Sequence, residues 1–206
     1  MLDMMMRSGG AAGPTTLLQD LFTGGAGELA AHTPDEDTAG NGWVEDVGDW
    51  ELDGSGNAFQ VDNTPSGQKL ATVDVEAADV VITLNLTTPD LPPAAAAVRA
   101  TFRVASSTSY WVAELNVTGN LFKIREFQSG FTDRASTSVT INFNTSYEIK
   151  VTLSGTSITA TLDGANEISY TSSANQSATK HGINEYRDNT NNNDGGLYED
   201  ILIVSN

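Results

Sequence analysis

From Trp43 to the end of the chain, apolar and polar residues alternate in short runs that are separated by glycine, asparagine, aspartate and serine. A period of two is typical of strands with one buried and one exposed face. The pattern predicts about fourteen strands and no helix, which indicates an all-β protein. The predicted strands are Trp43–Val47, Trp50–Leu52, Ala58–Val61, Lys69–Val75, Asp79–Thr87, Val98–Ala105, Tyr110–Val117, Leu121–Gln128, Ser138–Phe143, Tyr147–Leu153, Ser157–Leu162, Glu167–Tyr170, Lys180–Tyr186 and Leu197–Val204.

Tight turns between these runs predict how the strands pair. Gly119–Asn120, Ser154–Gly155 and Asp163–Gly164 each separate two alternating runs, and such residues adopt a positive φ at low cost. We therefore expect antiparallel hairpins, and a sandwich or jelly roll of two antiparallel sheets. The side chains expected in its core are Phe22, Trp43, Trp50, Phe102, Trp111, Leu115, Ile124, Ile141, Ile149, Val151, Ile158, Leu162, Ile201 and Ile203.

Residues 1–19 fall outside the strand pattern and are predicted to form a flexible arm ahead of a single domain, residues 20–206. The segment is rich in methionine, glycine and alanine, and it contains one proline. Residues 1–16 are expected to become ordered only when they dock on a neighbouring subunit. The adaptable apolar anchors of this assembly arm would be Met4, Met5, Met6, Leu17 and Leu18.

Charge and composition exclude several partners. The chain has 10 basic and 27 acidic side chains, a formal net charge of −17, so it should repel phosphate backbones and anionic lipid headgroups. We expect neither nucleic acid nor a membrane as a direct partner. There is no cysteine, which removes disulfides and thiolate chemistry. The first residues lack an apolar run of signal-peptide length, and no stretch is apolar enough to predict a membrane span.

The two ends of the chain carry a family resemblance. Asp20–Thr23, "HTPD" (His32–Asp35) and Gly42–Trp43, together with "SYEIKVTLSGTSITATLDGANEISYT" (Ser146–Thr171) and "LYEDILIVS" (Leu197–Ser205), resemble concanavalin A-like lectin/glucanase domains. In particular they resemble the laminin-G-like jelly rolls of bacteriophage structural proteins. The resemblance covers about residues 20–206, and it implies a sandwich in which the first strand pairs near the last. This fold carries lectins, hydrolases and structural modules, so it does not define the function.

Carboxylates and histidines offer candidate catalytic groups. Glu45, Asp46, Asp49, Glu51 and Asp53 crowd one short segment, and glycosidases need two carboxylates flanking the sugar bond. The Glu-x-Asp-x-Glu strand of laminarinase-like members is absent, so a solvated strand face is the preferred interpretation and we expect no enzyme. For the two histidines, His32 and His181, we expect structural hydrogen bonds.

The loop between the last two predicted strands offers a possible ligand site. Its side-chain oxygens are the kind of ligand that calcium requires, although the spacing is not that of an EF-hand. Calcium is the one cofactor considered, with Asp188, Asn191, Asn193 and Asp194 as its ligands. In lectins of this fold the corresponding loop can bind sugar, so a glycan contact is the other hypothesis, through Tyr186, Asn189 and Tyr198.

Two functions from different classes fit these features. The first is a non-enzymatic virion structural protein, a phage capsid decoration or tail-associated protein on the virion surface, assembled in the host cytoplasm. Its partners would be other virion subunits in a homo-oligomer or on a coat lattice. The alternative is a carbohydrate-binding module, or a glycan hydrolase, that acts on a surface polysaccharide.

Overall fold

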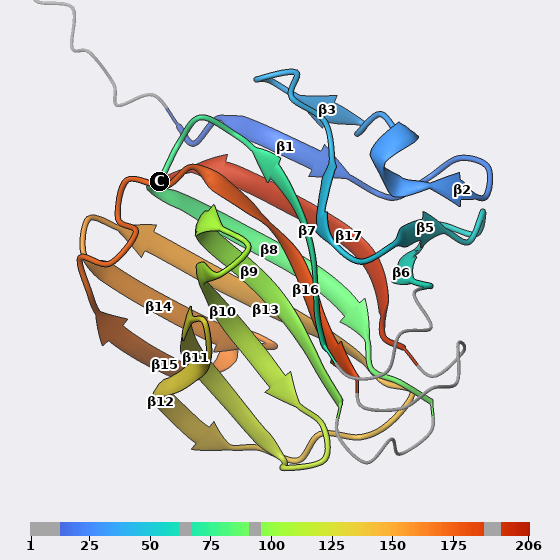
Figure 1. The fold of residues 1–206 in the computed structure, drawn as a ribbon. Coiled ribbons are helices and arrows are strands. Elements are labelled where there is room, and N and C mark those ends of the chain that lie inside the picture. The colour runs from blue at the N-terminus through green and yellow to red at the C-terminus, as the bar shows by residue number, and fades with distance from the viewer. Residues whose placement is uncertain (1–12, 62–66, 91–95, 188–194) are drawn as a thin grey trace, which may run out of the picture.

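The computed structural model describes residues 13–61, 67–90, 96–187 and 195–206, which form two antiparallel sheets packed face to face (Figure 1). The first has ten strands. Its order is β15 (Ala165–Thr171), β14 (Ser157–Leu162), β13 (Ser146–Ser154), β8 (Val80–Thr87), β17 (Leu197–Ser205), β6 (Ala58–Gln60), β5 (Trp50–Leu52) and β2 (Gly27–Glu28); β1 (Thr16–Asp20) pairs with β17, and β3 (Glu36–Asp37) pairs with β1. A short 3₁₀ helix, Leu29–Ala31, follows β2.

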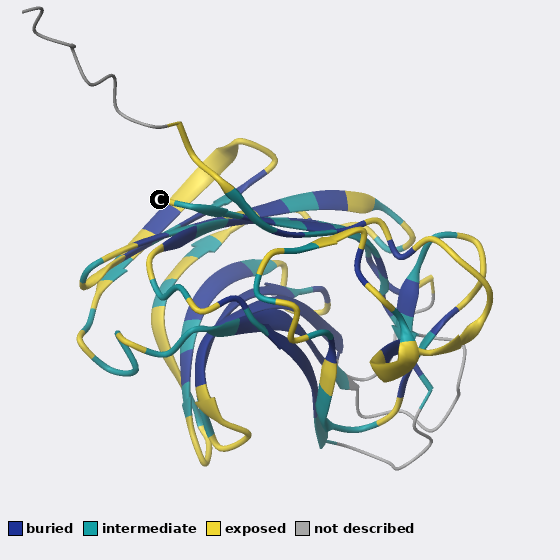
Figure 2. Cartoon of the chain, turned by 90° about the horizontal axis from the view of Figure 1, so that it is seen from above, coloured by how far each residue is buried: buried dark blue, intermediate teal, exposed yellow. Residues whose placement is uncertain are grey.

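The second sheet has seven strands, and it carries the candidate site described below. Its order is β12 (Phe131–Ser138), β11 (Leu121–Gln128), β10 (Ser109–Asn116), β9 (Ala96–Ser106), β16 (Lys180–Arg187), β7 (Gly67–Asp74) and β4 (Val44–Val47). The long buried strands of this sheet curve into an arch (Figure 2). The predicted all-β antiparallel sandwich is therefore confirmed.

The main core lies between the two sheets, and every side chain predicted for it is at most 5% exposed. The predicted hairpins also form. β10 turns into β11 through Asn120 at φ 52°, β13 into β14 through Gly155 at φ 54°, and β14 into β15 through Asp163 and Gly164 at φ 52° and 67°. Local alternation and turn chemistry were sufficient for these features because both act between residues close in sequence.

Leu17 and Leu18 belong to the sandwich and not to the arm. Both lie in β1, which pairs antiparallel with the final strand β17, and Leu18 is fully buried in the main core. The sandwich thus begins before Asp20, and the expected pairing of the first strand with the last is confirmed. Residues Met4, Met5 and Met6 lie outside the described residues, so the arm itself stays a prediction.

The strand predicted at Ser138–Phe143 is wrong. The structure has β12 at Phe131–Ser138 instead, and the chain after Ser138 leaves the sheet. β12 is an edge strand whose residues are mostly exposed, so its serines and threonines show little alternation. Ile141 is nevertheless buried, and its backbone N–H donates to Asn120 Oδ1 at 2.8 Å. Within the described ranges, no helix has the length and apolar character that a membrane crossing requires.

Candidate functional site on the outer face of the seven-stranded sheet

Charged residues interrupt the apolar strands of the seven-stranded sheet on the side that faces away from the main core. In β9, Val98 and Ala100 belong to that core, so the intervening Arg99 points to the opposite side. In β10 the same alternation places Trp111 and Leu115 in the core and Glu114 on the other side. We call this second surface the outer face. It carries its own small apolar cluster, formed by Leu70, Val104, Tyr110 and Val112.

Strand register aligns the polar residues of the outer face in one row. Arg99 of β9 lies directly opposite Asn184 of β16 on one side and Glu114 of β10 on the other. Glu114 in turn lies opposite Lys123 of β11. Three consecutive hairpin strands and the distant strand β16 therefore place amide, guanidinium, carboxylate and ammonium groups side by side.

Arg99 is the centre of this row and is only 2% exposed. Its Nε donates to Glu114 Oε2 at 2.7 Å, and its Nη1 donates to Asn184 Oδ1 at 2.6 Å and to Gln68 Oε1. A buried charge is tolerated when it is paired and hydrogen-bonded in this way. The planar guanidinium is thereby held in one orientation.

Glu114 is fully buried and joins two arginines. Arg125 Nη1 donates at 2.9 Å to Oε2, the oxygen that also accepts from Arg99, and at 3.2 Å to Oε1. Burial alone would raise the pKa of the Glu114 carboxyl, but the two guanidinium groups outweigh that effect, and the pKa lies below its usual value. Asp133 extends the network, because it pairs with Lys123 at 2.9 Å and with Arg125 at 2.6 Å. Its pKa is lowered as well, since these cations outweigh its burial.

Aromatic rings border the network. The Phe131 ring lies 4.7 Å from the Arg99 guanidinium carbon and 4.4 Å from that of Arg125, so it packs on both cations. Phe127 stacks on Tyr110 with ring centroids 4.7 Å apart. On the other side of Arg99, the half-buried Tyr186 ring lies 6.0 Å from the guanidinium carbon. The outer face thus combines fixed polar groups with partly exposed aromatic rings.

The predicted ligand residues only partly reach this face. Tyr186 is on it, beside Arg99. Tyr198 is not available for a glycan contact, because its ring is fully buried against Trp50 and its hydroxyl donates to Asn184 O at 2.7 Å. Alternation in β17 did not reveal that this tyrosine is on the core side. The remaining residues of the predicted loop, Asp188, Asn189, Asn191, Asn193 and Asp194, lie outside the described residues, so calcium or sugar binding there stays a prediction.

Sequence reasoning missed the central residues of the outer face. A signal was present, because Arg99 in "AVRATF" and Glu114 in "WVAELNV" are charged residues within otherwise apolar strands. A charge at such a position requires a partner. Glu114 follows on the next strand of the same hairpin, but Asn184 comes from the distant strand β16, whose register is set by the tertiary fold.

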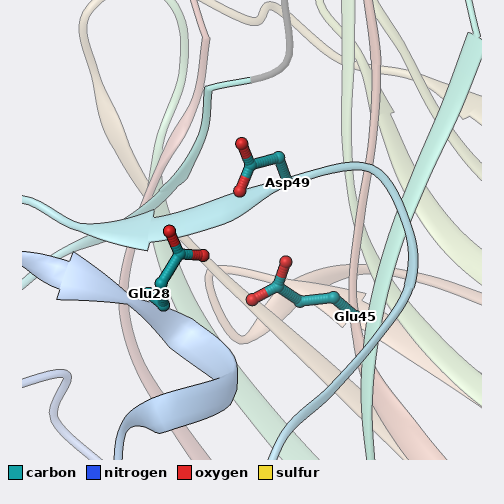
Figure 3. A group of neighbouring side chains, drawn as sticks. All are labelled: Glu28, Glu45 and Asp49. Carbon is teal, nitrogen blue, oxygen red and sulfur yellow. The ribbon is translucent and has the colours of Figure 1, made fainter.

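The acidic segment forms a separate group at the other end of the sheet. Glu45 and Asp49 meet Glu28 of β2, and one carboxylate oxygen of each lies within 4.8 Å of the others (Figure 3). Glu45 is held in place by the backbone N–H groups of Ala30 and Trp50, at 3.0 and 3.2 Å. Repulsion from Asp49 raises the pKa of Glu28. Three oxygens in this arrangement could hold a hard divalent cation. Glu28 and Asp49 are exposed, as expected of a solvated acidic surface.

Both histidines have structural hydrogen bonds, as predicted. His32 Nε2 lies 2.9 Å from the buried carboxylate of Asp20. His181 is fully buried, with its Nε2 2.9 Å from Ala77 O and its Nδ1 accepting the Arg103 N–H at 3.4 Å. Burial lowers the pKa of His181 to about 4, so its ring is neutral at pH 7.

Comparisons with known proteins support the fold. No protein family matches the chain, and no curated protein does either. Among solved structures, the chain is similar to the carbohydrate-binding module CBM66 from Bacillus subtilis, with a TM-score of 0.58 and 16% identity over 80% of this chain and 92% of the other. The Emp46p carbohydrate recognition domain, in its metal-free form, gives a TM-score of 0.61 with 9% identity, covering 85% of this chain and 93% of the other.

A third similar structure is an enzyme. The Bacillus licheniformis β-glucanase gives a TM-score of 0.54 with 12% identity, covering 89% of this chain and 99% of the glucanase. Together these structures define the class of fold as a concanavalin A-like jelly roll, which agrees with the resemblance seen in the sequence. At such low identity they show the fold alone.

Proposed function

We propose that this chain is a non-enzymatic carbohydrate-binding β-sandwich that holds a glycan on the outer face of its seven-stranded sheet. The observation that carries the proposal is the Arg99–Glu114–Arg125 network beside the half-buried ring of Tyr186. Sugar sites combine polar groups of fixed orientation with aromatic surface, because a sugar ring has hydroxyls at its edge and an apolar face. Similar folds with carbohydrate-binding names add support.

The electrostatics of the outer face favour binding over hydrolysis. A glycosidase needs one carboxylic acid with a raised pKa to protonate the leaving oxygen. Glu114 and Asp133, the carboxylates of the Arg99 and Arg125 network, both have a lowered pKa because they pair with cations. They are therefore suited to accepting hydrogen bonds and not to donating a proton.

Truncation of Tyr186 tests the proposal. Tyr186→Ala should weaken binding of soluble β-glucan or mucin O-glycans in isothermal titration calorimetry by about fivefold, since stacking of this kind contributes on the order of 1 kcal/mol. Tyr170→Ala is the matched control, because Tyr170 is also a half-buried tyrosine but lies on β15 of the other sheet. Equal loss in both variants, or no binding by the parent protein to either glycan, would contradict the proposal.

We further propose that the protein is located on the surface of a virion, on the basis of its sequence resemblance to phage structural proteins. The predicted arm, which precedes β1, would attach the sandwich to a coat lattice and leave the outer face free. Many copies on one particle would make weak glycan contacts effective, because linked sites raise the effective concentration. Mass spectrometry of purified particles against cell lysate tests this: many copies per particle are expected, and detection only as a free protein would contradict it.

A further inference from the structure

Two uncharged polar atoms of the outer face are buried without a hydrogen bond. Among the described residues, neither the Tyr110 hydroxyl nor Asn184 Nδ2 has a hydrogen-bond partner, and both side chains are fully buried. Asn184 Oδ1 accepts from Arg99, which orients the amide so that its N–H₂ group is directed elsewhere. Leaving such groups unpaired destabilises a protein, and native structures contain few of them.

The phenol of Tyr110 lies in the polar network of the outer face. Burial raises the pKa of Tyr110 to about 12, against opposing effects of the nearby Arg99 and Asn184. Asn184 therefore lies close to Tyr110, although the two groups lack the geometry of a hydrogen bond. Each retains hydrogen-bonding capacity that a bound hydroxyl could use.

Phe131 packs against the residues that surround this polar group. Its ring meets Tyr110 edge-on with centroids 6.1 Å apart, and the same ring packs on Arg99 and Arg125. Phe131 itself is half-buried and is the first residue of β12, directly after the turn at Ser129 and Gly130. Ser129 has a φ of 55°, and β12 is an edge strand paired on one side only. Phe131 therefore lies at the border of the seven-stranded sheet.

We propose that Phe131 covers a preformed subsite in which Tyr110 and Asn184 recognise a single hydroxyl or hydroxymethyl group of a terminal sugar. The inference rests on the proposed function, and it identifies the part of the glycan that the face recognises. Phe131 moves aside when the sugar enters, and the sugar hydroxyl then bonds the phenol and the amide. Retaining unpaired groups at a binding site, at the expense of stability, is a known trade-off.

Tyrosine nitration followed by mass spectrometry tests the cover without any glycan. With tetranitromethane, Tyr110 should be protected in the parent protein and modified in Phe131→Ala. Tyr198, which is buried elsewhere, should stay protected in both. Phe143→Ala, which removes another half-buried phenyl ring, is the matched control and should leave Tyr110 protected. If Tyr110 stays protected in Phe131→Ala, the inference is wrong.

Affinity for a β-glucan hexasaccharide and for mucin O-glycans tests the subsite. Tyr110→Phe should melt at the same or a higher temperature, because it removes an unpaired buried hydroxyl, yet bind about tenfold more weakly. Phe131→Ala should bind more tightly, and Phe131→Ala with Tyr110→Phe should lose that gain. Unchanged glycan affinity in Tyr110→Phe would overturn the subsite. If Tyr110 becomes nitrated in Phe131→Ala but no variant binds either glycan, the cover stands and the proposed glycan function fails.

Discussion

The carboxylate of Asp20 accepts the indole N–H of Trp43 at 2.7 Å, and this bond ties the end of β1 to the segment that leads into the seven-stranded sheet. Asp20 is fully buried and also accepts the Phe22 N–H at 2.8 Å and the His32 ring at 2.9 Å. The ring centroids of Phe22 and Trp43, two of the residues that donate to Asp20, are 5.7 Å apart. One side chain therefore organises the irregular segment from Asp20 to Trp43.

Replacement of Asp20 should therefore destabilise the whole sandwich. Asp20→Ala should lower the free energy of unfolding by about 2–4 kcal/mol, because it leaves buried donors without an acceptor. Asp35→Ala is the control, since Asp35 is exposed and accepts one backbone N–H, from Leu21. Asp35→Ala should lower the free energy of unfolding by less than about 1 kcal/mol. Urea unfolding measures both, and equal losses would contradict the central role of Asp20.

Stability should decrease as the pH falls, because of His181. Its pKa is about 4 in the folded protein, below the ordinary value of about 6.5 expected when the chain is unfolded. The unfolded state therefore binds the proton first, and stability is lost as the pH falls below about 6.5, by about 2 kcal/mol at pH 5. His181→Gln should show a weaker dependence between pH 7 and pH 5. Urea unfolding measures the free energy of unfolding of both proteins against pH. If the two depend on pH in the same way, His181 is not the cause.

Within the buried ion network, replacing Glu114 should lower the free energy of unfolding more than replacing either arginine. Glu114→Leu leaves Arg99 and Arg125 without their shared carboxylate, and we expect a loss of about 3–5 kcal/mol. In the double variant Arg99→Met with Glu114→Leu, part of that loss should be recovered, because the most buried unpaired charge is removed as well. Chemical denaturation measures the cycle. Additive losses would show that the two residues do not interact.

Gly182 should tolerate no side chain. A Cβ at this position of β16 would lie 2.2 Å from Ala71 O and 2.9 Å from Thr72 Cα, both of the paired strand β7. Gly182→Ala should therefore lower the free energy of unfolding by about 1–3 kcal/mol or more, since backbone has to move. Gly130→Ala is the matched control, because nothing lies within 4 Å of its Cβ position. A thermal melt of Gly182→Ala that matches this control would contradict the expected clash.

The local pattern of the sequence determined the fold class, most strands, the hairpins and the core. Alternation around Trp111 and Ile149 needs only neighbouring residues to be recognised, and the turn at Asp163 and Gly164 depends on the backbone preferences of those two residues. The strand β12 was missed because it lies at the edge of its sheet and is mostly exposed. Its sequence therefore does not need to alternate between apolar and polar residues. β1 was missed because the pairing of Leu18 with Ile203 joins opposite ends of the chain.

The composition of the outer face was decided largely by tertiary structure. The sequence shows Arg99 and Glu114 as charges on consecutive apolar strands, which a hairpin brings together. No local signal says that Asn184, from the distant strand β16, completes the row. The register of β16 against β9 sets the contact of Asn184 with Arg99, and a shift of one residue would move the Asn184 side chain to the other side of the sheet. The same reason explains Tyr198, whose position on the core side follows from the pairing of β17 with β8 and not from the composition of its strand.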